Sequence, residues 1–409
     1  MLQKSDLIVG LDMGTTKICC IIGERTATGE MNIVGFGSHP SRGLRRGVVV
    51  DIETTVAAIR GAIAEAEQMA GCEVTHVYAG IAGGHIRGFN SHGVVAVKDA
   101  EVAAGDVARV LEAARSVAIP ADREVLHILA QEYIIDAQAG IRAPLGMSGV
   151  RLEAKVHIVT GAASSAQNIV RCAQRCGVRV ADIVLEQLAS SEAVLSQDEK
   201  ELGVVLVDMG GGTTDVAIWR DGSVAHTAVV PLGGDHLTHD LAVGLRTPVE
   251  AAERIKQTYG RASMKGIDAD ATLEVPGVGG RVPRQLSQRR VVDILAARLE
   301  EIFLLVRQEV ERTGHLELVA SGAVLTGGTT LLAGIAELAE DSLGLPVRCA
   351  APVGVGGLVD VVGSPKHATG VGLVLYGRAK EEGQTAVPLH DTLYVRVRSR
   401  IRTWLGDFF

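Results

Sequence analysis

Two segments of this sequence repeat one pattern, and that repeat constrains the fold more than any other feature. The segment "DLIVGLDMGTTKICCIIGE" lies near the N-terminus, and "GVVLVDMGGGTTDVAIWRDG" lies in the second half of the chain. In each, an apolar run ends at an aspartate, Asp12 or Asp208, and a turn of glycine and threonine leads into a second apolar run. This pattern predicts a strand–turn–strand hairpin, and two distant copies predict two related lobes instead of a short-period repeat.

The two predicted turns have a composition that suits a phosphate group. Their small residues let several backbone N–H groups point at one anion. Asp12 and Asp208 would supply carboxylate oxygens to a hydrated Mg²⁺, and Lys17 would neutralise phosphate charge. A single such turn is equally well explained by an ordinary glycine hairpin, but two copies in matching contexts favour a ligand site. The turn residues predicted to bind are Gly14, Thr15, Thr16, Gly210, Gly211, Gly212, Thr213 and Thr214.

Motifs of other nucleotide-binding folds are missing from the sequence. The chain contains no Gly-Lys dipeptide, which a Walker A loop requires. It also contains no G-x-G-x-x-G, and the run after the first turn is typical of a strand, where a dinucleotide-binding site needs a helix. The sequence therefore disfavours a P-loop protein and a Rossmann dehydrogenase.

Strand and helix patterns alternate along the rest of the chain. Asp51 is placed to cap a helix over residues 52–70 that ends at Gly71. Between residues 85 and 161 the pattern changes to short strands broken by glycine, with one helix over 107–119 that Pro120 ends, so this block is interpreted as an insertion. Strands and helices mixed in this order indicate an α/β protein.

Composition and charge exclude several classes of protein. A net charge of −8 argues against a general nucleic-acid binder, which needs a basic surface. The N-terminal residues place charges and a DMG turn where a signal peptide needs an apolar run, and no apolar run reaches the roughly 20 residues that cross a bilayer. The six cysteines form no CxxC pair, so we expect reduced core residues in a cytoplasmic protein.

Longer stretches resemble a known family. The two hairpins together with "VLTGG" resemble the superfamily of actin, hexokinase and the 70-kDa heat-shock ATPases, in which ATP lies between two lobes. Three stretches, "PSRGLRRGVVVDIE", "LHILAQEYIIDAQAGIRAPLGMSGVRLEAKVHIVTGA" and "PLGGDHLTHDLAVGLRTPVEAAERIK", are similar to the FtsA family of bacterial cell-division proteins. The resemblance implies a two-lobed, actin-like (ribonuclease H-like) α/β fold with an inserted small α+β subdomain and a C-terminal amphipathic helix.

The resemblance also implies how the chain is divided. The expected parts are a first-lobe core (1–84 and 162–198), an inserted subdomain for protomer contacts (85–161), a second-lobe core (199–234 and 316–382), an outer subdomain that binds the C-terminal peptide of the tubulin-like protein FtsZ (235–315), and a linker with a membrane-targeting helix (383–409).

Further site residues follow from the resemblance. Glu253 and Lys256 match the pair that contacts adenosine and ribose, although their i,i+3 spacing also fits an ordinary surface ion pair. Glu186 matches the group that positions the attacking water in relatives, although a glutamate between a strand and a helix is more often structural. The glycines implied near the phosphates are Gly233 and Gly234, and those implied against adenine are Gly327 and Gly328, where a strand over 322–328 is expected to enter a helix over 329–344.

The last residues have the pattern of a helix that lies in a membrane surface. An apolar stripe recurs at helical spacing and arginines flank it, which favours binding to anionic lipid. A helix docked on the protein's own core, or exposed for a partner, is the alternative. The stripe residues are Val397, Ile401, Trp404, Leu405 and Phe408, and the flanking arginines include Arg398, Arg400 and Arg402.

Together with these observations, the resemblance implies an ATP- and Mg²⁺-binding protein that forms filaments and tethers FtsZ to the cytoplasmic face of the inner membrane at the division site. We expect weak ATPase activity at most, contacts with other division proteins, and no binding to nucleic acid. Two alternatives stay open: a pilus-assembly ATP-binding scaffold of the same fold, and a small-molecule kinase of the same superfamily. A chaperone is disfavoured because too few residues follow the last predicted core helix to form a substrate-binding domain.

Overall fold

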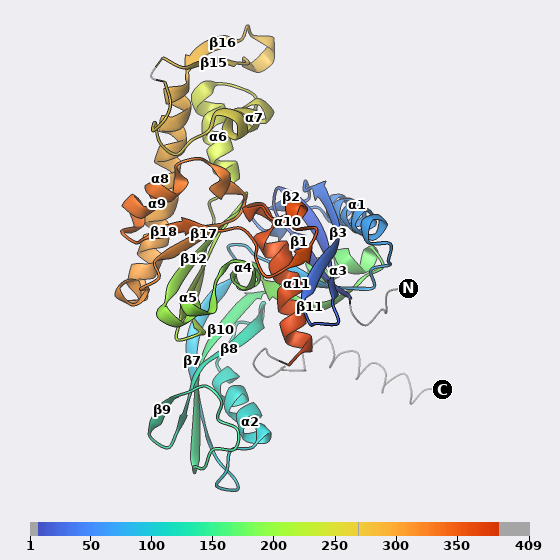
Figure 1. Cartoon of the computed structure of the whole chain (residues 1–409), viewed down its shortest axis with the longest axis vertical. Helices are drawn as coiled ribbons and strands as arrows, with labels where there is room; N and C mark the ends of the chain where they lie inside the picture. Colours follow the sequence, from blue (N-terminus) through green and yellow to red (C-terminus); the bar gives the residue numbers. More distant parts are fainter. Residues whose placement is uncertain (1–6, 269, 384–409) are drawn as a thin grey trace.

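The computed structural model of the chain describes residues 7–268 and 270–383 (Figure 1). The predicted membrane helix, with its site residues from Val397 to Phe408, lies outside these ranges. Within them, no helix combines the length and apolar character that crossing a bilayer requires. Two sheets occupy the middle of the molecule, and a smaller body extends from each end of it.

The first lobe is built on a six-stranded sheet with the order β11-β6-β1-β2-β3-β19. The predicted first hairpin is present: β1 pairs antiparallel with β2, and β6 adds in parallel beside β1. Strand β1 is buried along its whole length, as its continuous apolar run requires. The strands are β1 (Leu7–Met13), β2 (Lys17–Arg25), β3 (Met31–Pro40), β6 (His76–Ile81), β11 (Arg179–Leu185) and β19 (Gly356–Gly357); the short pair β4 (Leu44–Arg45) and β5 (Val48–Val49) lies outside this sheet.

The second lobe repeats this arrangement in a five-stranded sheet with the order β14-β13-β12-β17-β18. Strand β12 pairs antiparallel with β13 across the second predicted turn, and β17 adds in parallel beside β12. The same local pairing in both sheets confirms the expectation of two related lobes. The strands are β12 (Val204–Met209), β13 (Thr214–Arg220), β14 (Ser223–Val230), β17 (Ala323–Thr326) and β18 (Val347–Cys349).

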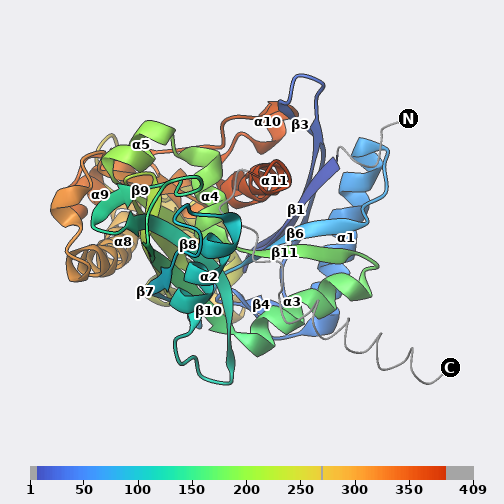
Figure 2. The ribbon, with the colours of Figure 1, turned by 90° about the horizontal axis from the view of Figure 1, so that it is seen from below.

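Helices cover both faces of the first sheet (Figure 2). Helix α1 (Ile52–Ala70) packs on β2 and β3, and its predicted ends are confirmed: the Asp51 carboxylate accepts a hydrogen bond from the Thr54 N–H, and Gly71 adopts a left-handed φ of 65°. The other helices of this region are α3 (Ala163–Arg175), α4 (Glu186–Val194), α10 (Val359–Val362) and α11 (Ala368–Glu381), whereas α5 (Gln197–Leu202) packs on β13 of the second sheet.

The last described elements return to the first lobe, and here the structure differs from the sequence grouping, which assigned residues 316–382 to the second-lobe core. Strand β19 pairs in parallel with β3, and α11 packs on β1 and α4. The cause is close packing: a Cβ on Gly10 of β1 would lie 2.7 Å from the Gly370 carbonyl oxygen, so the glycine lets α11 approach the strand directly.

An inserted module with its own core forms the lower end of the molecule in Figure 1. Its four antiparallel strands have the order β7-β10-β8-β9. The helix ends earlier than predicted, at Arg115 instead of shortly before Pro120, because Ser116 leaves the helical region and its hydroxyl donates to the Glu112 carbonyl. The elements are β7 (Arg87–Ala96), α2 (Ala104–Arg115), β8 (Arg123–Ile135), β9 (Gln138–Ile141) and β10 (Arg151–Ala162).

The opposite end of the molecule belongs to the second lobe. Helices α6, α7 and α8 pack against one another and share the core of the second sheet, and a two-stranded hairpin lies at the tip (Figure 1). The elements are α6 (Gly234–Leu245), α7 (Val249–Tyr259), β15 (Thr272–Val275), β16 (Arg284–Ser287), α8 (Gln288–Arg312) and α9 (Ile335–Leu343).

Two smaller predictions are wrong. The helix expected over 329–344 is split, because Gly334 has a φ of 81°: a 3₁₀ turn (Gly328–Leu331) comes first and α9 begins only at Ile335. The cysteines are free thiols, as expected, but Cys349 on edge strand β18 is exposed instead of buried in a core.

Candidate functional site

A cavity of about 500 Å³ lies between the two lobes. Both hairpin turns line it, together with the start of α4, the paired side chains of α7 and the glycines after β17. The structure therefore gathers residues that are far apart in the sequence at one place. The predicted residues that line the cavity are Asp12, Gly14, Thr15, Thr16, Lys17, Glu186, Asp208, Gly210, Gly211, Gly212, Thr213, Gly234, Glu253, Lys256, Gly327 and Gly328.

Two predicted residues, Thr214 and Gly233, do not line the cavity. The Thr214 side chain is fully buried and its hydroxyl donates to the Leu232 carbonyl oxygen at 2.9 Å, so it holds the following loop instead. A Cβ on Gly233 would lie 2.7 Å from the carbonyl oxygens of Gly210 and Gly211. Gly233 therefore packs directly against the backbone of the second turn, where a side chain would not fit.

The two turns contact each other directly across the cleft. A Cβ on Gly211 would lie 2.0 Å from the Thr16 hydroxyl oxygen, and one on Gly212 would lie 2.5 Å from the Thr15 hydroxyl oxygen. The Thr15 hydroxyl oxygen also accepts a hydrogen bond from the Gly47 N–H at 3.0 Å. A side chain at Gly211 or Gly212 would therefore collide with the first turn. The two turns can lie this close together only because the second turn has glycine at these positions.

Among the six described carboxylate residues that line the cavity, four lie near the two turns and the start of α4: Asp12, Glu186, Asp208 and Asp215. Burial is the first cause that raises the pKa of each of these four. Repulsion from neighbouring carboxylates adds to it for Glu186, Asp208 and Asp215, whereas Lys17 opposes it for Asp12. The pKa of Asp208 rises to about 6 and that of Asp215 to about 7. Since burial and repulsion both disfavour the charged forms, the cluster favours an added positive charge.

Lys17 supplies part of that charge. Its ammonium lies 3.7 Å from Asp12 Oδ2, 3.0 Å from the Cys19 sulfur and 3.5 Å from His367 Nδ1. Burial is the largest single cause and lowers the pKa of Lys17, but Asp12, Cys19 and Asp208 together outweigh it and the pKa is raised. Lys17 is therefore a cation at neutral pH, on the side of the cavity where the first turn ends.

Asp208 and Asp215 differ in how far their oxygens are satisfied. Asp208 Oδ2 accepts hydrogen bonds from the hydroxyls of Ser190 on α4 and Thr369 on α11. Asp215 Oδ2 accepts one from the Thr213 hydroxyl at 2.8 Å, but its buried Oδ1 has no partner. An unpartnered buried carboxylate oxygen fits a site that receives a further donor, such as a cation-bound water.

The other end of the cavity carries the pair that the resemblance implied for adenosine and ribose. Lys256 Nζ lies 2.8 Å from Glu253 Oε2 and also donates to the Gly234 carbonyl oxygen at 3.0 Å. The pair is therefore tied to the loop beside the second turn, instead of being a free surface ion pair. Gly327 has a φ of 91°, and a Cβ there would lie 2.5 Å from Asp208 Oδ1.

The donor set fits a hydrated cation better than a directly bound one. Among the residues that the structure describes, no three His, Cys, Asp or Glu side chains converge as a bound metal requires. Mg²⁺ commonly keeps several waters and is held by one or two carboxylates together with phosphate oxygens. Asp12 and Asp208 on the two facing hairpins fit that mode.

Several residues of the site were missed by the sequence analysis: Asp215, Ser190, Thr369 and Asp235. For Asp215 there was a usable signal: it lies two positions after Thr213, already a candidate, at the point where the predicted strand begins, and residues two apart in extended chain share a face. Ser190 and Thr369 carried no local signal, since only the packing of α4 and α11 brings their hydroxyls to Asp208.

Family models match two parts of the chain. One described as cell division protein FtsA matches residues 205–372, and one described as the SHS2 domain inserted in FtsA matches residues 83–160. The cell division protein FtsA of Pseudomonas aeruginosa is 52% identical, over 99% of this chain and 99% of that protein. FtsA of Escherichia coli K12 is 39% identical over the full length of both chains.

Solved structures share the fold at low sequence identity. The PilM–PilN type IV pilus biogenesis complex matches with a TM-score of 0.66 at 17% identity, over 91% of this chain and 98% of that one. MreB5 of Spiroplasma citri bound to ADP matches with a TM-score of 0.56 at 14% identity, over 93% and 98%. These likenesses confirm the predicted actin-like fold.

Proposed function

The chain belongs to the FtsA family of bacterial cell division proteins, and on this premise we propose that it binds ATP with Mg²⁺ in the cleft between its lobes. The contact between the two turns supports this proposal most strongly. A ligand held there is held by both lobes at once, so its presence affects the angle between them. The family assignment also makes the pilus scaffold and the small-molecule kinase less favoured interpretations.

The residues of the cavity have separate roles in this proposal. Backbone N–H groups of the two turns and the Lys17 ammonium bind the phosphates, and Asp12 and Asp208 hold the waters of the cation. Glu253 and Lys256 contact adenosine and ribose, and Gly327 and Gly328 leave room for the base. Bound Mg²⁺ would neutralise phosphate charge and the surplus charge of the carboxylates.

Glu186 keeps the proposed role of positioning a water molecule. It lies at the N-terminus of α4, where burial first and then the nearby carboxylates raise its pKa well above the usual range. Because these causes favour the form of Glu186 that already carries a proton, they make this side chain less available as a general base. This agrees with the expectation of weak ATP hydrolysis at most.

The cellular role extends the same proposal. Nucleotide binding would favour self-association into filaments, and the outer part of the second lobe would bind the C-terminal peptide of FtsZ. The C-terminal segment would attach the filament to anionic lipid on the cytoplasmic face of the inner membrane, at the division site. Many weak attachments on one filament would give firm anchoring.

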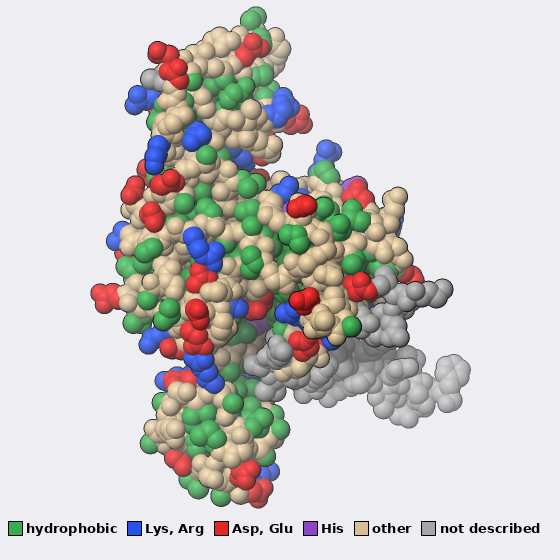
Figure 3. All heavy atoms as spheres, viewed as in Figure 1, with side chains coloured by type: hydrophobic (Ala, Val, Ile, Leu, Met, Phe, Trp, Pro, Cys, Tyr) green, Lys and Arg blue, Asp and Glu red, His purple; other side chains and the backbone are tan. Residues whose placement is uncertain are grey.

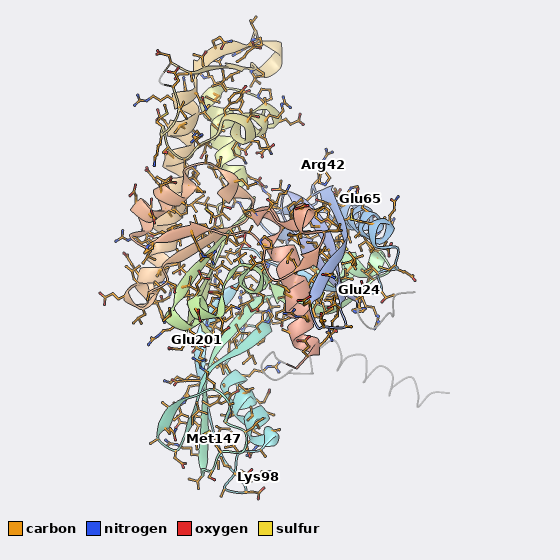
Figure 4. All side chains as sticks on the ribbon, viewed as in Figure 1. Glu24, Arg42, Glu65, Lys98, Met147 and Glu201 are labelled. Carbon is orange, nitrogen blue, oxygen red and sulfur yellow. The ribbon has the colours of Figure 1, made fainter. Side chains whose placement is uncertain are left out.

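Removal of the Lys17 charge tests the nucleotide site. We expect Lys17→Ala to weaken Mg-ATP binding by at least about tenfold, since one charge-assisted contact contributes about 1.5–3 kcal/mol. The matched control is Lys98→Ala, an exposed lysine at the far end of the inserted module (Figure 4). Titration calorimetry measures both. Equal affinity of Lys17→Ala and the control would contradict the placement of the phosphates.

A further inference from the structure

The inserted module is joined to one lobe and packed against the other. Its polypeptide leaves the first lobe after β6 and returns to it at α3. Its sheet, however, packs against β14, which is the edge strand of the second sheet. Figure 1 shows the long strands β7, β8 and β10 running down from the junction of the two lobes. The module therefore has mechanical contact with both lobes.

The first contact with the second lobe is made by Gln131 of β8. Its amide nitrogen donates to the carbonyl oxygens of Val224 and Ala225, at 2.9 and 3.2 Å. Because β14 is an edge strand, no further strand of its sheet pairs with it on this side, and a side chain satisfies these carbonyl groups instead.

The second contact is buried. The His157 ring has no exposed surface; Nδ1 lies 2.7 Å from the Asn90 side-chain oxygen and Nε2 lies 2.9 Å from the Thr227 hydroxyl of β14. A Cβ on Gly88 would lie 2.6 Å from both His157 Nε2 and the Thr227 hydroxyl oxygen. The glycine therefore permits this close approach between module and lobe.

The third contact is a paired ion bridge. Both Arg142 terminal nitrogens lie 2.5 Å from the two Glu201 oxygens, and Glu201 lies on α5, which leads into β12. The turn after β13 is hydrogen-bonded to α5, so Glu201 is fixed to the second lobe. Figure 3 shows basic and acidic side chains meeting at this junction, and Figure 4 labels Glu201 there. We call Gln131, His157 and Arg142, with their partners on the second lobe, the module clamp.

At its entry, the joint with the first lobe consists of two glycines, Gly83 and Gly84, which connect β6 to the module. Gly83 is buried with a φ of 119°, which favours glycine, and a Cβ there would lie 3.1 Å from the Arg46 carbonyl oxygen. Gly84 is exposed, and a Cβ there would meet nothing nearer than 4.0 Å. Two small residues at a joint are able to absorb a backbone rotation.

At the exit of the module, β10 leads directly into α3. Hydrogen bonds also join the module to the first lobe, from the Leu185 N–H to His127 Nε2 and from the Ala163 N–H to the Asp122 carbonyl oxygen, each at 3.0 Å, with apolar packing around the first of them.

We propose that the module clamp makes the inserted module move with the second lobe, and that Gly83 and Gly84 act as its hinge to the first. A change in the angle between the lobes then swings the far end of the module relative to the first lobe. The proposal that the module moves with the second lobe rests on the contacts of Gln131, His157 and Arg142. The step in which ATP drives the swing rests on the proposed function.

Distances between three sites in the full-length protein test this inference. Spin labels carried by a non-natural amino acid leave the six native thiols unlabelled. The positions are Lys98 on the module, Gln68 on α1 of the first lobe and Glu300 on α8 of the second, all exposed. The clamp variant is Gln131→Ala with Arg142→Ala, which leaves the buried His157 in place so that the module keeps its fold. The matched control is Arg151→Ala, which removes an ion pair within the module.

Without nucleotide, we expect the distribution of Lys98–Glu300 distances to be clearly broader in the clamp variant than in the wild type and the control. Exchange of the charges, Arg142→Glu with Glu201→Arg, should keep the narrow distribution of the wild type, whereas Arg142→Glu alone should not. A clamp variant with a Lys98–Glu300 distribution as narrow as that of the wild type would overturn the clamp.

With saturating Mg-ATP, we expect the wild-type Lys98–Gln68 distance to change while the Lys98–Glu300 distance stays constant. A change in Lys98–Glu300 with constant Lys98–Gln68 would show that the module follows the first lobe and would overturn the inference. If ATP binds and changes neither distance, the hypothesis that ATP drives the swing is wrong. The measurement without nucleotide still tests whether the module clamp holds the module to the second lobe. Failure of ATP to bind at all would contradict the proposed function.

Discussion

At the scale of single residues, the site contains buried carboxylates whose charged forms are unfavourable unless a cation or another donor is bound in the cleft. Asp215 shows this most clearly: its carboxylate is buried, one of its oxygens has no partner, and its pKa is raised to about 7 by burial first and by Asp208 second. A residue with these properties is not expected from selection for stability. It is expected where an external charge completes the site.

The raised pKa of Asp215 predicts a pH dependence of stability. Between the ordinary aspartate value of 3.8 and about 7, the folded protein holds a proton that the unfolded chain has released, so the free energy of unfolding falls as pH rises through this range. Asp215→Asn removes this loss. We expect the variant to be more stable than the wild type at pH 8, by an amount on the order of a few kcal/mol, and the advantage to shrink toward pH 4.

Urea denaturation without nucleotide at several pH values measures the difference between the two proteins. Asp99→Asn, an exposed position on the inserted module, is the control and should show no comparable trend. A difference between Asp215→Asn and the wild type that stays constant from pH 4 to pH 8 would contradict the assignment.

At the scale of elements, local rules explain where many helices begin and end. Helix α1 follows its sequence signals at both ends, because Asp51 and Gly71 satisfy backbone groups with atoms of the same segment. The helix expected over 329–344 does not, since Gly334 adopts a φ of 81° and interrupts it. The sequence shows that glycine is present at both places, but only the surroundings decide whether it ends a helix or splits one.

The same substitution should therefore have opposite effects at two glycines. Gly71 has a φ of 65° with open space around it, so Gly71→Ala should destabilise the protein by about 1 kcal/mol through backbone strain alone. Gly105 lies within α2, also in open space, and Gly105→Ala should stabilise the protein by up to about 1 kcal/mol. Chemical denaturation measures both, and effects of the same sign would contradict the helix ends described here.

At the scale of the whole molecule, the two lobes meet at the turns, at α4 and α11, and at the inserted module. Helix α11 begins at the cleft, where Thr369 bonds to Asp208, and its far end pairs with Arg25 of β2 through Glu381. In the sequence, the predicted linker and membrane helix over 383–409 follow α11. Helix α11 is therefore the last described element between the proposed nucleotide site and these residues.

The membrane prediction belongs to this scale, because it concerns the intact protein on a surface. We expect Trp404→Glu to reduce sedimentation with anionic vesicles by at least about tenfold, since it replaces a large apolar side chain by a charge of the same sign as the lipid. Mg-ATP binding should be unchanged in the same variant. Equal sedimentation of the variant and the wild type, with and without ATP, would remove the C-terminal segment from the mechanism.

The sequence by itself determined the local units of this protein. Two hairpins with aspartate before a small turn, the capped α1 and the run of strands in the insertion all follow from interactions between near neighbours, so composition and spacing were sufficient to predict them. The resemblance of long stretches then predicted the actin-like fold and the family. Most of the candidate site residues could be named in this way, because they lie on turns with a recognisable pattern.

Only the tertiary structure decided how these units meet. It turned Thr214 away from the cavity and Asp215 toward it, and it brought Ser190 and Thr369 from two distant helices onto Asp208. It also returned α11 to the first lobe and placed Gln131 against the second. These outcomes depend on packing between segments far apart in the chain. The whole fold determines which side chains meet there, and the residues next to them in the sequence carry no signal of that contact.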